Sequence, residues 1–114
     1  MITRETLELA ALAAGYGEHI ETPWKILTVA EGLIHLNGDG SAAVLKWRPH
    51  TDPGDAARLA DKLLMYVDSR GTAVQARVVD GEWHRIGRDG NPNAWCEAVV
   101  KCAAAVGEKM KVGA

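Results

Sequence analysis

The chain has 114 residues, of which 47% are hydrophobic and 25% are charged, close to the averages for soluble globular proteins. This composition excludes an intrinsically disordered chain, a collagen-like fibre and a small disulfide scaffold. Thirteen basic and fifteen acidic residues give a net charge of −2, without the basic excess typical of nucleic-acid-binding domains. We therefore expect one domain over residues 1–114, with a core of its own.

The first half of the chain predicts a helix followed by short strands. Residues 3–14 carry hydrophobic side chains at helical spacing, with Thr3 as the expected N-cap and Gly15 as the stop. After a polar loop, hydrophobic runs bounded by turn-forming residues predict three strands, over residues 26–29, 33–36 and 42–47, the last entered through a turn over 37–41.

The second helix has the clearest start signal in the chain. Asp52 is expected at the N-cap, Pro53 at the first helical position and Asp55 in the first turn. Hydrophobic residues then recur at helical spacing from Ala56 to Val67, which predicts one apolar stripe along the helix.

An Asp-Gly pair separates the next two hydrophobic runs, residues 72–79 and 82–86. This pattern predicts a hairpin closed by a two-residue type I′ turn. In that register Val78 faces Trp83 and Arg77 faces His84, so Trp83 and Arg77 lie on opposite faces of the hairpin.

The last helix is expected to start at Asn91-Pro92. Its predicted buried stripe consists of Trp95, Val99, Cys102, Ala103, Val106 and Met110. Cys96 and Cys102 are too far apart on a helix for a disulfide, which requires Cα atoms within about 7 Å. Two free thiols, no signal-peptide pattern and no membrane-spanning run predict a cytoplasmic protein.

The predicted order is helix, about three strands, helix, two-stranded hairpin and helix. Short connections and hairpins favour a largely antiparallel sheet. Three helices are too many for one face of a sheet of about five strands. We therefore expect an α+β fold, a three-layer α-β-α sandwich with three helices and about five strands.

Residues 47–63 follow the pattern Trp-x-Pro-x-Thr-Asp-x-Gly-Asp-Ala-x-Arg-Leu-Ala-x-Lys-Leu. This segment resembles the signature of the phage ABA (α-β-α) sandwich domain, a family of small phage and prophage proteins. The last helix and the Leu- and Ala-rich first helix are similar too, so the resemblance spans nearly the whole chain. Arg48 and His50 depart from the family pattern, in which an Asn and an apolar residue stand. The resemblance implies a phage origin and a sandwich architecture, and it implies no site.

The most informative cluster of polar residues lies between residues 47 and 58. It consists of Trp47, Arg48, His50, Asp52, Asp55 and Arg58. The free N–H groups of a helix N-terminus can hold an anion, which makes this cluster a candidate binding site. Capping by the two aspartates is the structural alternative, because their carboxylates satisfy the same N–H groups and repel anions.

A second cluster, Arg77, Trp83, Arg85 and Arg88, lies on the predicted hairpin. It predicts either cation–π packing and phosphate contacts or an ordinary cross-strand surface ladder. The four histidines and two cysteines match no metal-binding spacing, and no phosphate loop or nucleophile elbow is present. We therefore expect no metal, no cofactor and no catalytic residue.

These observations predict a non-enzymatic phage accessory protein that binds a host or phage macromolecule in the bacterial cytoplasm, for example in counter-defence. The expected partner is a protein, with a homo-oligomer as a further expectation, whereas nucleic acid and membrane are not expected partners. One alternative is a small-ligand or nucleotide-binding protein or enzyme with a pocket near residues 47–58. The other is a nucleic-acid-binding module centred on the second cluster.

Overall fold

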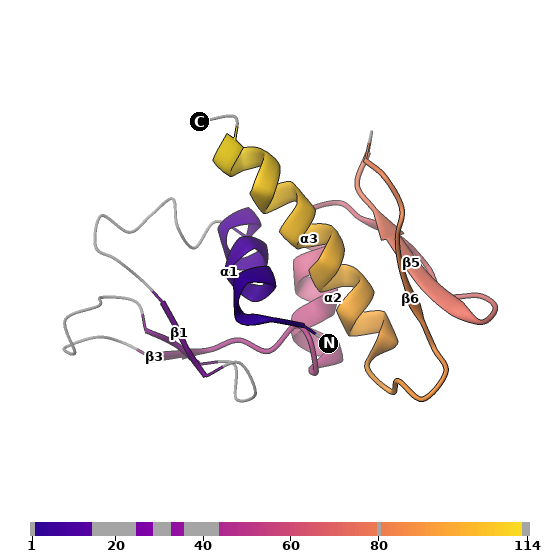
Figure 1. The fold of residues 1–114 in the computed structure, drawn as a ribbon, viewed down its shortest axis with the longest axis horizontal. Coiled ribbons are helices and arrows are strands. Elements are labelled where there is room, and N and C mark those ends of the chain that lie inside the picture. Colours follow the sequence, from indigo (N-terminus) through magenta and orange to yellow (C-terminus); the bar gives the residue numbers. More distant parts are fainter. Residues whose placement is uncertain (1, 15–24, 29–32, 36–43, 80, 113–114) are drawn as a thin grey trace.

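The chain forms an α+β fold of helices and short antiparallel strands (Figure 1). The computed structural model describes residues 2–14, 25–28, 33–35, 44–79 and 81–112. The helices in these ranges are α1 (Arg4–Ala13), α2 (Pro53–Lys62) and α3 (Ala94–Val112). The strands in them are β1 (Lys25–Thr28), β2 (Leu33–His35), β3 (Val44–Lys46), β4 (Tyr66–Asp68), β5 (Ala73–Arg77) and β6 (His84–Gly87).

The described strands pair into two separate antiparallel sheets, in the orders β1-β2-β3 and β4-β5-β6. Figure 1 shows the helices between the two sheets, with β1 on the side of α1 and β5 and β6 on the side of α3. The predicted α+β class and antiparallel pairing are confirmed. The single sheet of about five strands with helices on both faces is not confirmed, because the described strands divide into two sheets of three.

The burial of α3 explains why it lies between other elements. On one side, Val99 and Ala103 pack in a core cluster with residues of α1 and α2. On the other side, Cys102 packs in a second cluster with Val74 and Ala76 of β5. A helix that is apolar on two sides has to be covered on both, so α3 occupies the centre of the fold.

Small residues allow α1 and α3 to approach each other closely. Ala10 and Ala11 of α1 and Ala103 of α3 are fully buried in the shared core. A Cβ added at Gly107 would collide with the carbonyl oxygen of Leu9 and would lie 2.8 Å from its carbonyl carbon. Only glycine fits at this crossing without a shift of one helix.

Both predicted helix starts are confirmed. The Thr3 hydroxyl oxygen accepts a hydrogen bond from the backbone N–H three residues later, at 3.2 Å, and caps α1. The Asp52 carboxylate accepts a hydrogen bond from the Gly54 N–H at 3.0 Å and caps α2. The predicted stop at Gly15 and the turn over 37–41 lie outside the described residues.

Helix α2 ends earlier than its hydrophobic pattern predicts. Leu64 follows the helix with a φ of 54°, the left-handed conformation that glycine usually adopts at this position. The Met65 N–H donates to the Ala60 carbonyl at 2.9 Å and closes the helix end. The prediction that Val67 continues the stripe of α2 is wrong, because Val67 lies in β4, a strand that the sequence did not predict.

The β5–β6 hairpin differs from its predicted register by one residue. Ala76 is opposite His84, and the same register continues along both strands. The predicted pairs, Val78 with Trp83 and Arg77 with His84, are therefore wrong. Because alternate residues of a strand point to opposite faces, this shift moves Trp83 onto the face that carries Arg77.

The turn of the hairpin accounts for the different register. The Gly81 N–H donates to the Val78 carbonyl at 2.9 Å. This bond closes the hairpin one residue earlier than the predicted two-residue turn would, and residue 80 of the Asp-Gly pair lies outside the described residues.

Helix α3 begins shortly after the predicted start. In the predicted stripe Val99, Cys102 and Ala103 are buried, and Trp95, Val106 and Met110 are half-buried. Cys96 and Cys102 are buried free thiols, which confirms the prediction that they form no disulfide with each other.

Candidate functional site

The six residues predicted as a binding site are close together in the chain. They lie in the turn that precedes α2 and in the first half of that helix. Trp47 and His50 are 6% and 7% exposed, so their side chains are withdrawn from solvent. Pro49 between them is fully buried. Two of the six predicted side chains, Trp47 and His50, are therefore buried, whereas Arg48 between them in the chain is half-buried.

The two aspartates of this turn interact with their own chain. Asp55 accepts a hydrogen bond from the Arg48 N–H at 2.9 Å and forms an ion pair with Arg58. Asp52 caps the helix as described above. These contacts are those expected of the structural alternative, and binding of a ligand at this turn stays a prediction.

A different cluster lies on the face of the β4–β6 sheet that points away from α3, called the outer face below. The Arg77 guanidinium carbon lies 4.9 Å from the centroid of the Trp83 ring and 5.7 Å from that of Tyr66. Strand pairing places Tyr66 opposite Arg77. The cation thus contacts two aromatic rings from the neighbouring segments on either side of β5, in a row across the sheet.

Four large apolar side chains of the β4–β6 sheet and the segments next to it are exposed. Leu64, Tyr66, Val79 and Trp83 are 74%, 57%, 61% and 44% exposed. Leu64, Tyr66 and Val79 line one groove of about 620 Å³ beside α2, and Tyr66 and Trp83 line a second hollow of about 490 Å³. Contiguous exposed apolar side chains of this size are typical of interaction surfaces.

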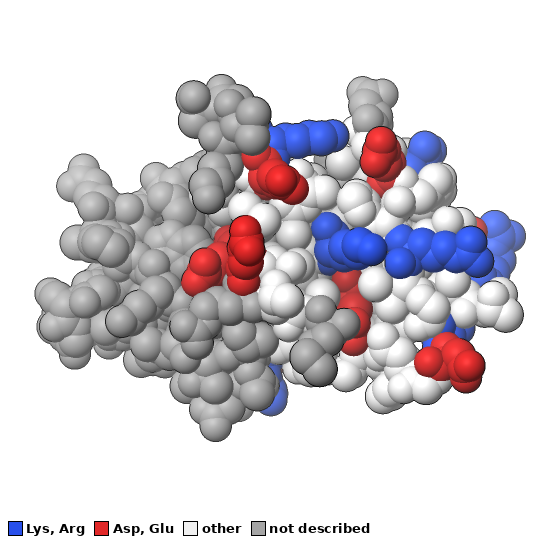
Figure 2. Space-filling view, in the orientation of Figure 1, with Lys and Arg blue, Asp and Glu red and all other residues white. Residues whose placement is uncertain are grey.

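Polar side chains of both signs lie around this cluster. Asp68 forms an exposed ion pair with Arg70 at 3.2 Å, and this hydrogen-bonded arginine lowers the pKa of the Asp68 carboxyl. Arg88 donates to the Ser69 carbonyl oxygen, and Arg85 is opposite Gln75 in the strand pairing. Figure 2 shows a different side of the molecule, on which a short row of basic side chains crosses α3 toward the hairpin, with acidic side chains around it.

The Nε atom of Arg77 is buried and has no hydrogen-bond partner among the described residues. Leaving a buried donor of a charged group without an acceptor costs free energy. A carboxylate or carbonyl oxygen brought by a binding partner would remove that cost if the Arg77 side chain adjusts to meet it.

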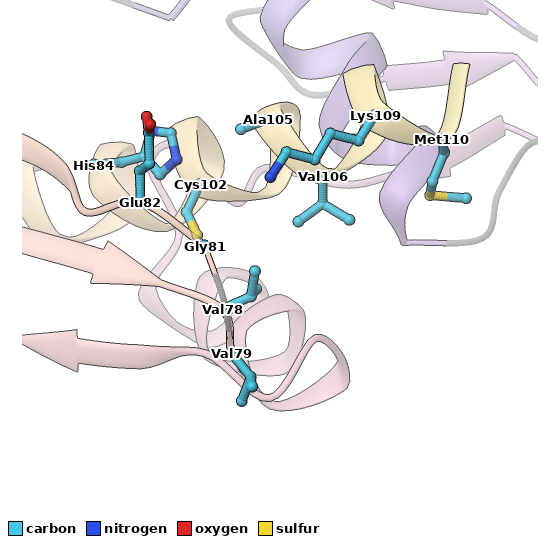
Figure 3. A pocket seen from close by; sticks show the side chains of 10 residues that line it. All are labelled: Val78, Val79, Gly81, Glu82, His84, Cys102, Ala105, Val106, Lys109 and Met110. Carbon is cyan, nitrogen blue, oxygen red and sulfur yellow. The ribbon is translucent and has the colours of Figure 1, made fainter. Parts of the chain in front are cut away.

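A cavity lies between the β5–β6 hairpin and the C-terminal half of α3. It has a volume of about 680 Å³. Figure 3 shows its lining residues, which are Val78, Val79, Gly81, Glu82, His84, Cys102, Ala105, Val106, Lys109 and Met110.

Burial shifts the pKa of the two thiols of α3 and of a histidine that lines the cavity. Burial raises the pKa of both thiols, Cys96 and Cys102, so both stay protonated and unreactive at neutral pH. Cys96 is only 3% exposed. Burial and then Lys101 lower the pKa of His84, Lys109 lowers it further, and Glu82 opposes them.

Within the described residues, no group of three or more His, Cys, Asp and Glu side chains is placed to hold a metal ion. No helix in the same part of the chain is both long and apolar enough to span a membrane. Comparisons with protein-family models, curated proteins and solved structures found no match to this chain.

The structure brings Arg77 and Trp83 of the second predicted cluster into contact on one face of the sheet, whereas the sequence predicts them on opposite faces. Tyr66 and Leu64 were missed, because the hydrophobic pattern continues the second helix through them. Two signals were present in the sequence. Leu63, Leu64, Met65 and Tyr66 form a continuous apolar run that no single helical face can bury, and Tyr and Val favour strands.

Proposed function

We propose that this chain is a small non-enzymatic protein that acts by binding another protein through the outer face of its β4–β6 sheet. The observation that carries the proposal is the row of Tyr66, Arg77 and Trp83, with the two rings more than two-fifths exposed. Tyr, Trp and Arg are the residues most enriched among the anchors of protein interfaces. Leu64 and Val79 extend the row with exposed apolar surface.

The chemistry of the row also indicates what a partner has to supply. Its apolar side chains require a partner with apolar surface of matching shape. Arg77 favours a partner with an acceptor oxygen for its guanidinium, which lies against the two rings. A protein segment with an exposed carboxylate or carbonyl beside an apolar side chain meets both requirements.

Nucleic acid meets them less well. Single-stranded nucleic acid stacks its bases on free aromatic faces, but both rings here contact Arg77. Residues 64–90 contain four arginines and four acidic residues, so the segment as a whole has no net charge, unlike the basic regions that attract phosphates. The predicted module of Arg77, Trp83, Arg85 and Arg88 is therefore the weaker proposal.

A phage or prophage origin is part of the proposal, and its support is the pattern over residues 47–63. An origin of this kind places the partner among host or phage proteins of the bacterial cytoplasm, with counter-defence as one role. The pattern over residues 47–63 is also the only support for the three-layer α-β-α sandwich that the resemblance implies.

Affinity capture with paired baits tests the function. Wild-type protein immobilised in a bacterial lysate should retain a stoichiometric partner, and the Trp83→Ala variant should lose it. Arg58→Ala is the matched control, because Arg58 is also exposed but lies on α2, and it should capture as well as the wild type. Equal capture by Trp83→Ala and wild type would contradict the proposal.

Two further measurements separate the other functions. Light scattering that shows a dimer in the wild type and a monomer in Trp83→Ala would identify the partner as a second copy of this chain. Salt-sensitive retention on single-stranded DNA that is lost in Trp83→Ala would replace the protein partner with nucleic acid. A nucleotide that raises the melting temperature would instead support a pocket near residues 47–58.

A further inference from the structure

Strand β6 forms one edge of the β4–β6 sheet. Among the described strands, β6 pairs with β5 on one side and with no strand on the other. Arg85 and Gly87 of this strand are exposed. Because glycine has no side chain, the exposure of Gly87 is exposure of the backbone itself. The backbone of this edge is therefore accessible to another chain.

The hydrogen bonds between β5 and β6 show which backbone groups point outward. Opposite residues of antiparallel strands alternate between hydrogen-bonded and non-hydrogen-bonded pairs. Thr72 and Arg88 continue the register of the two strands, and the Arg88 N–H donates to the Thr72 carbonyl at 3.0 Å. Two positions back along β6, Ile86 therefore also bonds to β5. The N–H and C=O groups of Arg85 and Gly87 point the other way, toward the free edge.

Strand β4, at the other edge of the sheet, offers less backbone. By the same alternation Tyr66 and Asp68 bond to β5, so Val67 is the one residue of β4 whose groups point outward. Val67 is also half-buried. An added strand therefore finds two accessible residues at β6 and one less accessible residue at β4.

The side chains of the outer face define what an added strand would meet. The row of Tyr66, Arg77 and Trp83 ends at Trp83, directly before β6. The next row of the same face ends at Arg85, which is exposed and forms no ion pair with a described residue. A strand paired with β6 places one side chain beside Trp83 and another, two residues along, beside Arg85.

From this geometry we propose that the partner binds as an extended segment added to β6, with an apolar side chain beside Trp83 and a carboxylate beside Arg85. The inference rests on the proposed function and specifies how that partner is held. Backbone hydrogen bonds to Arg85 and Gly87 supply affinity, and the two alternate side chains supply specificity. The carboxylate and Arg85 form an opposite-charge pair across the two strands.

A second copy of this chain fits the edge less well. Antiparallel pairing of β6 with its own counterpart would place the two Arg85 side chains opposite each other or adjacent on one face. Like charges in such positions repel each other. The sequence of β6, His-Arg-Ile-Gly, also contains no acidic side chain that could pair with Arg85.

Random peptides displayed on phage are the probe for this edge, and they are selected on the immobilised full chain. The enriched sequences should carry an apolar and an acidic residue two positions apart. Synthetic peptides of these sequences are then titrated against the wild type and its variants by calorimetry. Replacing their acidic residue by the corresponding amide should weaken binding about threefold, as expected for one exposed ion pair. Arg85→Ala should have an effect of the same size.

Proline substitutions test the backbone bonds. Gly87→Pro removes an outward N–H and no bond to β5, so the strand should tolerate it. The partner's carbonyl would lose its donor, and peptide binding should weaken at least about tenfold. Gly87→Ala is the matched control, because it keeps the N–H and should bind like the wild type. Circular dichroism shows whether each variant is folded.

Hydrogen exchange of the wild type gives the same information without a substitution. The Arg85 and Gly87 amides should exchange rapidly in the free chain and slowly when peptide is bound. Unchanged exchange of both amides would overturn the inference. So would equal peptide affinity of folded Gly87→Pro and Gly87→Ala, or a selection that enriches no peptide.

The outcomes also separate this inference from the proposed function. Peptides that lose affinity for Trp83→Ala but bind Gly87→Pro like the wild type would leave the outer face as the binding surface and overturn strand addition alone. Peptides unaffected by either variant would contradict both. Light scattering that shows a dimer lost in Gly87→Pro would overturn the inference, because the occupant of the edge would then be a second copy.

Discussion

The two sides of the β5–α3–α1 stack differ in the size and the exposure of their side chains. At the α1–α3 crossing, alanines and Gly107 let the two backbones approach closely, and the residues that make this contact are small and buried. On the outer face of the β4–β6 sheet, Leu64, Tyr66, Val79 and Trp83 are exposed and uncovered by any described residue. The first side stabilises the fold, and the second carries apolar area that folding alone does not bury.

This difference suggests where substitutions should have their effects. Close packing at the helix crossing leaves no room for change, so substitutions there should reduce stability. Leu64, Tyr66 and Val79 are more than half exposed, so their substitution should change stability little and affect binding instead.

Gly107→Ala should cause the largest loss of stability, at least about 1–3 kcal/mol in the free energy of unfolding. The added methyl group would collide with the Leu9 carbonyl of α1, and backbone atoms cannot move aside as a flexible side chain can. Urea unfolding followed by circular dichroism measures the change.

Gly87→Ala is the matched control for that substitution. Gly87 lies in β6, has no heavy atom within 4 Å of its added Cβ and is not among the described glycines with a positive φ. Alanine should therefore be tolerated and should change the free energy of unfolding by less than about 1 kcal/mol. If the two variants were equally stable, the close α1–α3 crossing would be wrong.

Asp52→Ala should reduce stability by about 1 kcal/mol, since it removes the side chain that accepts the Gly54 N–H at the start of α2. Asp52→Asn should retain most of the stability, because an amide oxygen can accept the same hydrogen bond. Thermal unfolding of both variants measures this. If Asp52→Asn lost as much stability as Asp52→Ala, Asp52 would contribute through its charge and not through capping.

Leu64→Gly should increase stability slightly, by about 0.5–1 kcal/mol. The left-handed φ of 54° strains a leucine by about 1–2 kcal/mol, and glycine recovers part of this after its own entropy loss. The side chain is 74% exposed, so little burial is lost. Urea unfolding should show the gain, and weaker partner capture should accompany it if Leu64 belongs to the binding face. A loss of stability would contradict the strain.

His84→Asn should weaken the pH dependence of stability on the acidic side. The pKa of His84 lies below its ordinary value of 6.5 in the folded chain, so the unfolded chain takes up the proton more readily. The contribution of His84 to wild-type stability is complete above pH 6.5 and falls as the pH drops below that value. Unfolding between about pH 7.5 and 5.5 should show a smaller fall in the variant. Identical slopes would contradict the direction of the shift.

Local chemistry was the predictable part of this fold. Asp52 and Pro53 mark the start of α2 because capping depends on residues within one turn. The two free cysteines followed from helix geometry. Both successes rest on contacts between residues that are close in the sequence.

The candidate site was not predictable in the same way, because it depends on one residue of register. Moving the hairpin pairing by one position takes Trp83 from the buried face to the face of Arg77. Val67 was assigned to a helix because its spacing suits one, whereas pairing with β5, a distant segment, determines its place in β4. Long-range pairing overrides a local pattern in both cases.

Site-specific photo-cross-linking tests the central claim, that the outer face of the β4–β6 sheet is the binding surface. A photoreactive phenylalanine analogue is placed at position 83 or at position 58, both exposed, and the protein is irradiated in a bacterial lysate. Our account predicts one discrete cross-linked partner from position 83 and none from position 58. A discrete product from position 58 alone would contradict it and would return the site to the turn before α2.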